Sequence, residues 1–252
     1  MADLVLLTAA TPNGQKCSIA IEELRAHYGD RIKCEYKPIA MQKNEQKTPE
    51  FLAVNPNGRI PALTDKSRND FPVMESAAIN MYLCQHYDQD HVLSFADPNE
   101  TSQLVQWIIW AQSGLGPMQG QANHFVRYAP EKIEYGMTRY VNETKRLYGV
   151  LEGRLKDRDY LVGPSKGQYS LADINSYTWV RFHAWAGIET LDAFPNLKRW
   201  LDTISERPAV QAGISIPDKD TITKMKELGD DHEAIAKMQA KSAKWVQDSN
   251  KL

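Results

Sequence analysis

The sequence predicts a small α/β domain followed by an all-α domain, and three features of the chain support this. Short strand and helix patterns alternate up to about residue 88, a polar, aspartate-rich stretch occupies residues 87–100, and helical periodicity prevails after it. A chain of 252 residues is long enough for two modest domains. We expect domains over residues 1–88 and 99–212, a linker over residues 89–98, and a charged, partly helical C-terminal extension over residues 213–252.

The first domain is predicted to place helices on a mixed sheet. The apolar run at residues 4–7 is typical of a strand, and the turn-forming string TPNG at residues 11–14 separates it from apolar residues at helical spacing. Pro61 falls at the start of a later strand, where its missing N–H does least harm to a sheet. The order of elements is typical of a βαβ unit followed by a ββα unit. The predicted strands are 4–7, 32–37, 61–65 and 71–74, and the predicted helices are 15–28 and 76–87.

Helix-capping signals mark the second domain. Residues 97–100, Asp-Pro-Asn-Glu, combine an acidic N-cap with a proline and a glutamate in the first turn, and Ser170 with Asp173 has the spacing of a capping box. Helical spacing of apolar residues continues for about six turns from Pro130, and another helix is predicted from about residue 195 to a stop at residue 208. The second domain is therefore predicted to be helical throughout.

Composition and charge argue against several classes of protein. Charged residues make up 25% of the chain and the net charge is −2, without the clustered Lys and Arg of a nucleic-acid-binding protein. No apolar run reaches the roughly 18 residues of a membrane span, and the N-terminal stretch carries Asp3 and no basic segment, unlike a signal peptide. The three cysteines, Cys17, Cys34 and Cys84, lack a CxxC spacing, which favours free thiols in a reducing compartment. We expect a soluble cytoplasmic protein with no nucleic-acid or membrane partner.

The start of the first predicted helix is a candidate anion site. Backbone N–H groups near Gly14 and the positive end of the helix dipole attract negative charge, and Thr11 and Asn13 add hydrogen-bond donors there. This arrangement would stabilise a thiolate supplied by a ligand. Ordinary capping of a helix by the same residues is the commoner explanation when this stretch is taken alone.

A second helix start, at Glu75 and Ser76, suits an amino acid head group. The Ser76 hydroxyl and N–H can meet a carboxylate, while Glu75 can meet an ammonium group. A glutamate at a helix N-terminus is also ordinary dipole chemistry, so this pair alone is weak. The two helix starts together are more specific, because a cysteine-containing peptide with a free amino-acid end fits both. Glutathione is such a ligand.

Other motifs are weaker candidates. The glycine-rich string at residues 114–120 resembles a dinucleotide-binding fingerprint only loosely, because Gln119 takes the place of the third glycine and no strand precedes it. The histidines lack the spacing of a metal site, so no metal is expected, and His124 is expected to be structural or at the surface. Trp179 is more typical of a core than of a cofactor site, and Cys17 is expected to act as a small buried apolar residue.

Longer strings carry a family resemblance. TPNGQK, EFLAVNPNGRIPAL, MESAAINMYL and SLADI, in this order, resemble the glutathione transferase family over about residues 1–212. LVQWIIWAQSGLGPMQGQANHF and RYVNETKRLYGVLEGRL are similar to the group that contains the nu-class disulfide-bond reductases and the fungal transferases related to the yeast nitrogen-catabolite regulator. The resemblance implies the glutathione transferase fold, with a thioredoxin-like first domain and an all-helical second domain, and a homodimer.

The resemblance also assigns residues. Thr11 and Asn13 would face the sulfur of glutathione, which would bring the nucleophile that other classes supply as Tyr, Ser or Cys. Ile60, before a cis Pro61, would pair its backbone with the cysteinyl unit. The remaining implied contacts are Glu75 and Ser76 with the γ-glutamyl end, Gln46 and Arg59 towards the glycyl carboxylate, and Arg139 towards a second glutathione or the disulfide form.

The implied function is glutathione-dependent reduction of disulfides by thiol–disulfide exchange, and the resemblance leaves peroxidase or weak glutathione S-transferase activity open. The alternative is a regulatory or ligand-binding protein that kept the fold without useful catalysis, since fold does not fix function. No cysteine of the chain is expected to be catalytic, because Thr11 occupies the position where a helix dipole would activate a thiol. The extension departs from the bacterial members; Ile235, Met238 and Trp245 predict one amphipathic helix in it, and its role is not predicted.

Overall fold

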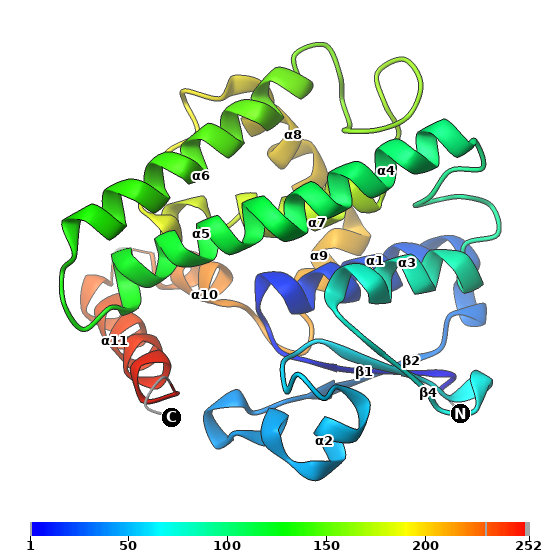
Figure 1. Cartoon of the computed structure of the whole chain (residues 1–252), viewed down its shortest axis with the longest axis horizontal. Helices are drawn as coiled ribbons and strands as arrows, with labels where there is room; N and C mark the ends of the chain where they lie inside the picture. Colours follow the sequence, from blue (N-terminus) through cyan, green and yellow to red (C-terminus); the bar gives the residue numbers. More distant parts are fainter. Residues whose placement is uncertain (1, 230, 250–252) are drawn as a thin grey trace.

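A four-stranded mixed sheet forms the first part of the computed structural model, which describes residues 2–229 and 231–249 (Figure 1). The strand order is β2-β1-β3-β4; β1 pairs with β2 in parallel, and the other two pairings are antiparallel. Leu6 of β1 lies opposite Tyr36 on one side and Leu63 on the other. The strands are β1 (Leu4–Thr8), β2 (Cys34–Pro38), β3 (Ala62–Asp65) and β4 (Phe71–Met74).

Two helices, α1 (Pro12–Tyr28) and α3 (Ser76–Tyr87), lie side by side on one face of the sheet, and α2 (Pro49–Val54) lies on the other (Figure 1). This is the thioredoxin-like arrangement that the sequence predicts. The first helix begins three residues before the predicted position 15, because the Thr11 hydroxyl caps it by accepting the Gly14 N–H at 3.2 Å.

The rest of the chain is helical, as predicted. A long rod forms from α4 and α5 because a π-helical segment joins them, and a second π-helical segment follows α5 (Figure 1). The helical elements are α4 (Pro98–Trp110), π segment Ala111–Leu115, α5 (Gly116–Asn123), π segment His124–Tyr128, α6 (Glu134–Arg154), α7 (Leu171–Val180), α8 (Pro195–Ser205), α9 (Pro208–Ile214), α10 (Thr221–Leu228) and α11 (His232–Ser249). None of the helices among the described residues is both long and apolar enough to cross a membrane.

The capping predictions and the predicted helix from residue 195 are confirmed, and the chain after residue 205 also holds helices that were not predicted. Asp97 accepts two backbone N–H groups at the start of α4, and the Ser170 N–H donates to the Asp173 carboxylate at 3.0 Å. Helix α8 ends at Ser205, before the predicted stop at Pro208, and Pro208 then opens a further helix, α9. The extension holds two helices where one was predicted, because α10 ends at Gly229, whose φ of +53° breaks the helical path.

The segment between the two domains folds around one buried carboxylate. Asp88 accepts the N–H groups of Val92 and Leu93 at 2.7 and 3.0 Å, and the hydroxyl of Ser94 at 2.8 Å. It also accepts the hydroxyl of Tyr28 from α1 at 3.2 Å. This loop is therefore fixed to α1, and the domain limits at residues 88 and 99 stay predictions.

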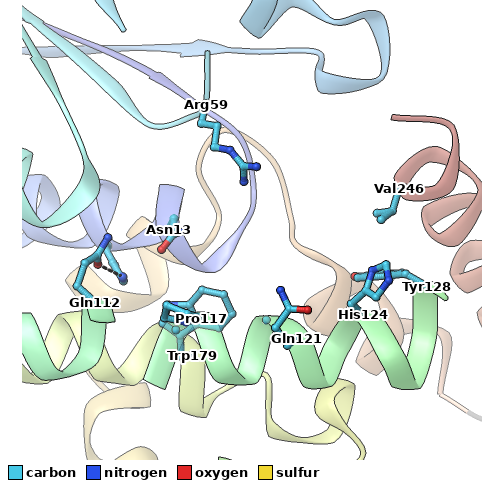
Figure 2. Close-up of a pocket in the computed structure, with 12 residues that line it drawn as sticks. Asn13, Arg59, Gln112, Pro117, Gln121, His124, Tyr128, Trp179 and Val246 are labelled. Atoms are coloured by element: carbon cyan, nitrogen blue, oxygen red, sulfur yellow. Dashed lines mark hydrogen bonds between the residues drawn. The ribbon is translucent and has the colours of Figure 1, made fainter. Parts of the chain in front are cut away.

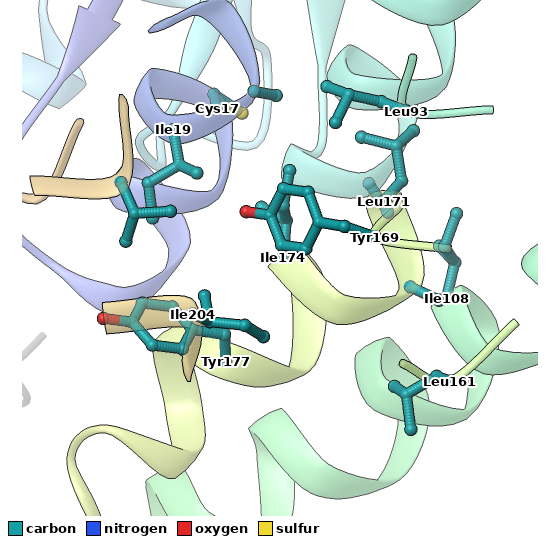
Figure 3. Close-up of a cluster of buried hydrophobic side chains, with 14 of the residues drawn as sticks. Cys17, Ile19, Leu93, Ile108, Leu161, Tyr169, Leu171, Ile174, Tyr177 and Ile204 are labelled. Carbon is teal, nitrogen blue, oxygen red and sulfur yellow. The ribbon is translucent and has the colours of Figure 1, made fainter. Parts of the chain in front are cut away.

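One continuous apolar core joins the two domains (Figure 3). Cys17 and Ile19 of α1 lie on one side of it, and Ile174 and Tyr177 of α7 on the other. Helix α7 is buried along almost its whole length. Its first turn contains the Asp173 carboxylate, which also accepts the Leu161 N–H and the Trp200 indole N–H; burial raises the pKa of this carboxyl group to about 6.

Helix α9 comes close to the backbone of α1 at Gly213. A Cβ added to Gly213 would lie 2.6 Å from Cα and 2.7 Å from the backbone N of Ile19. The Ser18 hydroxyl donates to the Gly213 carbonyl at 2.7 Å, which ties the two backbones together. The position of α1 therefore depends on a glycine near the end of the second domain.

We predict that Gly213→Ala lowers the free energy of unfolding by about 1–3 kcal/mol, because the methyl group meets backbone atoms that cannot move aside. The matched control is Gly149→Ala in α6, an exposed position with nothing within 4 Å of the new Cβ. There the helix propensity of alanine is expected to add about 0.5–1 kcal/mol. Urea unfolding measures both; a shift of the same sign and size in the two variants would contradict the packing argument.

Candidate functional site

The start of α1 is shaped by a glycine and capped by a threonine. Gly14 is required at this turn, because an added Cβ would lie 2.2 Å from the Ala9 carbonyl oxygen. The first turn of α1 contains no acidic residue, so its positive dipole end is not neutralised within the helix. The Thr11 hydroxyl oxygen accepts the Gly14 N–H, which leaves its own proton available to a ligand.

Beside this helix start, a narrow slot of about 60 Å³ brings together most of the predicted site residues. The cis peptide bond between Ile60 and Pro61, which the family resemblance implies, is present. The slot is lined by Asn13, Asn55, Arg59, Ile60, Pro61, Glu75, Ser76 and Gln112.

Glu75 and Ser76 occupy unusual positions in the slot. The Ser76 side chain is buried, and its hydroxyl has no hydrogen-bond partner among the described residues. A buried hydroxyl without a partner is costly, by about 1–3 kcal/mol. Glu75 has a φ of +69°, a conformation that costs a residue with a side chain about 1–3 kcal/mol and that often marks a binding site. Both features favour a polar ligand at this end of the slot.

The slot continues into a cavity of about 670 Å³, which we call the central cavity (Figure 2). Asn13, Arg59 and Gln112 line both spaces. In Figure 2 the Arg59 side chain extends into the central cavity from the loop before β3, towards the rod of α4 and α5. The rod and its two π segments contribute the opposite wall, with Gln112, Gln121, His124 and Tyr128. Such π segments are frequent at functional sites.

Lys16 is a charged residue of this cavity that the sequence analysis missed. Its side chain is 1% exposed, and its ammonium group donates to Gln112 Oε1 at 2.9 Å and lies 6.0 Å from the centre of the Trp179 ring. Desolvation lowers the pKa of Lys16 to about 8, against the opposing effects of Cys17 and Glu75. The signal was present in the sequence: Lys16 follows Asn13 by three residues and therefore shares its helix face.

His124 and Trp179 also line the central cavity, although Trp179 packs on the core as expected. The structure places both side chains on the wall of the central cavity, where His124 comes from the second π segment and Trp179 from α7. A close approach brings Trp179 there, because a Cβ on Gly116 would lie 2.9 Å from its indole nitrogen. No periodicity in the sequence reports such a contact.

Three predicted residues lie outside these two spaces. Thr11 lines a third cavity, beside Ala9 and Ala10. Gln46 is largely buried with an unpartnered Oε1, and it does not line the slot or the central cavity. Arg139 lies on α6 at a separate cavity beside Tyr135, with its guanidinium 5.9 Å from the Tyr140 ring. Within a single subunit Arg139 does not line the slot, because this stretch of α6 borders a separate cavity. The roles of Gln46 and Arg139 stay predictions.

None of the three cysteines lines the slot or the central cavity. Cys17 is fully buried, its thiol lies 3.6 Å from the Ser76 carbonyl oxygen, and burial raises its pKa. Burial also raises the pKa of Cys34 to about 12 and that of Cys84 well above its usual value. These thiols are protonated at neutral pH, so a nucleophilic sulfur at the start of α1 has to come from a ligand. Among the described residues, no group of three or more His, Cys, Asp or Glu side chains is placed to share a metal ion.

Comparisons with known proteins match both halves of the chain. The family model of the glutathione S-transferase N-terminal domain matches residues 3–85, and that of the C-terminal domain matches residues 128–208. Glutathione S-transferase 2 of Schizosaccharomyces pombe is 39% identical over 219 residues, which cover 81% of this chain and 91% of the relative. The disulfide-bond oxidoreductase YfcG of Escherichia coli is 38% identical over 209 residues, with the same two coverages of 81% and 91%.

A solved structure agrees with the match to the glutathione S-transferase family models. The crystal structure of the glutathione transferase URE2P6 from Phanerochaete chrysosporium, in complex with oxidized glutathione, superimposes with a TM-score of 0.77 and 39% identity over 84% of this chain and 94% of that chain. The resemblance to bacterial disulfide-bond reductases and fungal transferases is thereby confirmed. The chain belongs to the glutathione S-transferase family of enzymes.

Proposed function

We propose that the slot and the central cavity bind glutathione, and that the protein is a cytoplasmic glutathione-dependent disulfide-bond oxidoreductase. The observation that carries the proposal is the buried Ser76 hydroxyl without a partner, which lies in one slot with Asn13 at the un-neutralised start of α1. One end of the slot suits an amino acid head group and the other suits a thiolate. The relative YfcG is named a disulfide-bond oxidoreductase, and URE2P6 holds oxidized glutathione, which supports the same assignment.

Each part of glutathione has a matching group. Ser76 would bind the γ-glutamyl carboxylate through its N–H and hydroxyl, and Glu75 would bind the ammonium group. The backbone of Ile60 would pair with the cysteinyl unit, which places the sulfur near Asn13 and Thr11. Arg59, whose side chain extends into the central cavity, would meet the glycyl carboxylate.

Lys16 is proposed as the counter-charge of the thiolate. Its ammonium group is buried at the wall of the central cavity, and its hydrogen bond to Gln112 involves a neutral acceptor. An opposite charge within about 4–6 Å lowers the pKa of an acid by about 1–3. Lys16, the Asn13 amide and the dipole of α1 would therefore act together to keep the sulfur ionised.

The reaction then needs no group of the protein as nucleophile. The thiolate attacks one sulfur of the substrate disulfide; a mixed disulfide with glutathione forms, and the other sulfur leaves as a thiolate that takes up a proton. A second glutathione thiolate attacks the glutathione sulfur of the mixed disulfide. Two glutathione molecules and one disulfide thus give glutathione disulfide and two thiols.

Two substitutions should separate binding from turnover. We predict that Asn13→Ala lowers kcat for reduction of 2-hydroxyethyl disulfide by roughly 10- to 100-fold, because the lost donor acts on the sulfur, where charge changes during reaction. Ser76→Ala should mainly raise the KM for glutathione, because its hydroxyl meets a part of the ligand that does not react.

The comparison is made on wild type and both variants, with conjugation of 1-chloro-2,4-dinitrobenzene measured alongside. A wild-type protein that binds glutathione but turns over neither substrate would favour the alternative of a non-catalytic binding protein. An Asn13→Ala variant with unchanged kcat and weakened glutathione binding would contradict the role of the amide.

We further propose a homodimer. Large exposed apolar side chains occur on the first domain, where Phe71 of β4 and Met81 of α3 are 51% and 40% exposed. They also occur on the second domain, where Ile109 of α4 and Tyr135 of α6 are 53% and 77% exposed. Exposed apolar side chains on both domains suit a twofold-symmetric contact, in which the first domain of one subunit meets the helical domain of its partner.

We predict that Phe71→Glu converts a dimer, with twice the 28.6 kDa chain mass, into a monomer, because a carboxylate cannot be buried in an apolar contact without a large cost. Light scattering at micromolar concentration measures the mass. The control is Gln42→Glu, an exposed polar position in the loop after β2, and it should stay dimeric. A monomeric wild-type protein would rule out the dimer.

A further inference from the structure

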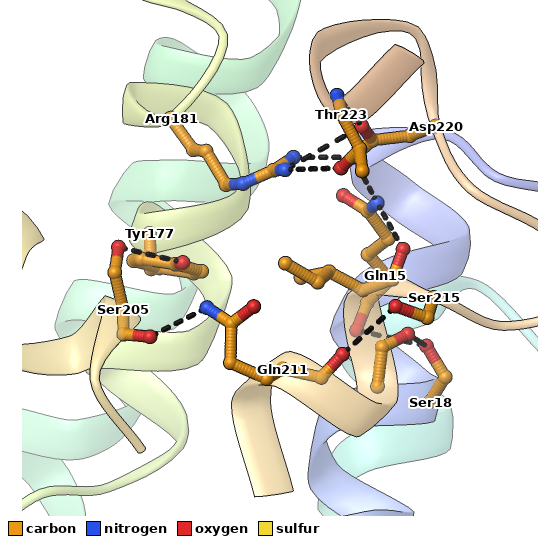
Figure 4. Close-up of polar contacts among 11 residues, drawn as sticks. Gln15, Ser18, Tyr177, Arg181, Ser205, Gln211, Ser215, Asp220 and Thr223 are labelled. Atoms are coloured by element: carbon orange, nitrogen blue, oxygen red, sulfur yellow. Dashed lines mark hydrogen bonds and ion pairs between the residues drawn. The ribbon is translucent and has the colours of Figure 1, made fainter. Parts of the chain in front are cut away.

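The start of α1 is fastened to the C-terminal extension by one buried carboxylate. Asp220, the N-cap of α10, accepts the side-chain amide of Gln15 of α1 at 2.5 Å and the Thr223 N–H at 2.7 Å (Figure 4). Gln15 is fully buried, and Asp220 is 1% exposed. Residue 220 lies beyond residue 208, where the match to the C-terminal family model ends. A segment outside that match thus contacts the helix that carries the proposed thiolate site.

Gln15 closes the first turn of α1. Its backbone N–H donates to the Thr11 carbonyl at 2.9 Å, while the Thr11 hydroxyl accepts the Gly14 N–H. The side chain that Asp220 holds therefore belongs to the residue that completes the turn from Thr11 through Asn13. Thr11 and Asp220 also line the same cavity, of about 900 Å³. The carboxylate thus lies within the length of one side chain of the proposed position of the sulfur.

Arg181 of α7 balances the charge of this carboxylate. Its guanidinium forms an ion pair with Asp220 and donates to the Thr223 hydroxyl at 2.9 Å (Figure 4). Desolvation alone would raise the pKa of Asp220, but Arg181 and the hydrogen bonds outweigh it and hold this pKa below its usual value. Asp220 is therefore an anion at neutral pH, beside a site that is proposed to hold a second anion.

The other charged groups around Asp220 have partners of their own. Lys219 precedes it and pairs with Glu227, and Lys224 of α10 pairs with Asp218. On α7, burial raises the pKa of the nearby Tyr177, so this hydroxyl stays neutral. Arg181 is therefore the cation that balances Asp220.

We propose that Asp220 is a positioning residue for the thiol–disulfide exchange: it fixes the first turn of α1 through Gln15, and Arg181 cancels its charge so that it does not oppose the thiolate. The inference rests on the proposed glutathione site and adds the C-terminal extension to the machinery of that site. Without Arg181 the carboxylate would repel a thiolate at the start of α1, and without Asp220 the guanidinium would attract it.

The test follows the thiolate absorbance of bound glutathione against pH in full-length variants. Arg181→Met should raise the pKa of the bound thiol by about 0.5–1, and Asp220→Asn should lower it by about as much, because each leaves one charge unbalanced. Asparagine keeps a good N-cap for α10 and an oxygen that can accept the Gln15 amide. The double variant, which has neither charge, should match wild type. So should the control Lys198→Met, which removes one partner of an exposed ion pair on α8.

Opposite shifts are a result that a merely structural contact does not produce, because loosening the first turn of α1 would move the pKa of the thiol the same way in both single variants. Circular dichroism checks the fold of each. Shifts of the same sign would overturn the inference and leave the proposed function intact, as would a folded Arg181→Met without a raised pKa or a folded Asp220→Asn without a lowered one. Either single variant thus decides alone if the other folds poorly. Failure of wild type to bind glutathione would instead overturn the proposed function, and the inference with it.

Discussion

The structure depends on the placement of the α1 N-terminus between the two domains. This helix packs on the sheet with one face, and α7 and α9 of the second domain pack against it. Its first turn has no acidic residue, so its positive end is directed at the slot without internal neutralisation. The contact of Gly213 with Ile19 and the hydrogen bond of Gln15 with Asp220 hold this end in register with the helical domain. The contacts that hold the two domains together therefore also position the positive end of α1 at the slot.

Lys16 adds charge at a cost in stability. Burial lowers its pKa to about 8 from 10.5, so the unfolded chain holds this proton more tightly than the folded chain. The resulting loss of stability is fully present below about pH 8 and fades as pH rises towards 10.5. The unpartnered Ser76 hydroxyl and the strained Glu75 backbone are unfavourable in the same way. An anionic thiol ligand with an amino acid head group would offset these costs, which supports the proposed glutathione site.

Local chemistry explains what the sequence could predict. The caps at Asp97 and Ser170 depend on neighbours within one helical turn, so they were visible in the chain, as was the order of strands and helices. The joint use of the two helix starts at Asn13 and Ser76 was predicted from their residue types and agrees with the family resemblance. The wall of the central cavity could not be predicted, because Trp179 and His124 reach it through helix packing that no local pattern records. A motif likewise does not record which way α6 turns Arg139, and the role of this residue stays a prediction.

The central claim is that the protein ionises the thiol of bound glutathione with Lys16 and the start of α1. The most direct measurement is a pH titration of the thiolate absorbance of bound glutathione in wild type, Lys16→Met and the exposed control Lys43→Met. We predict a bound thiol pKa about 1–3 below that of free glutathione in wild type and the control, and a value higher by about 1 in Lys16→Met. A bound thiol in wild type with the same pKa as free glutathione would contradict the account.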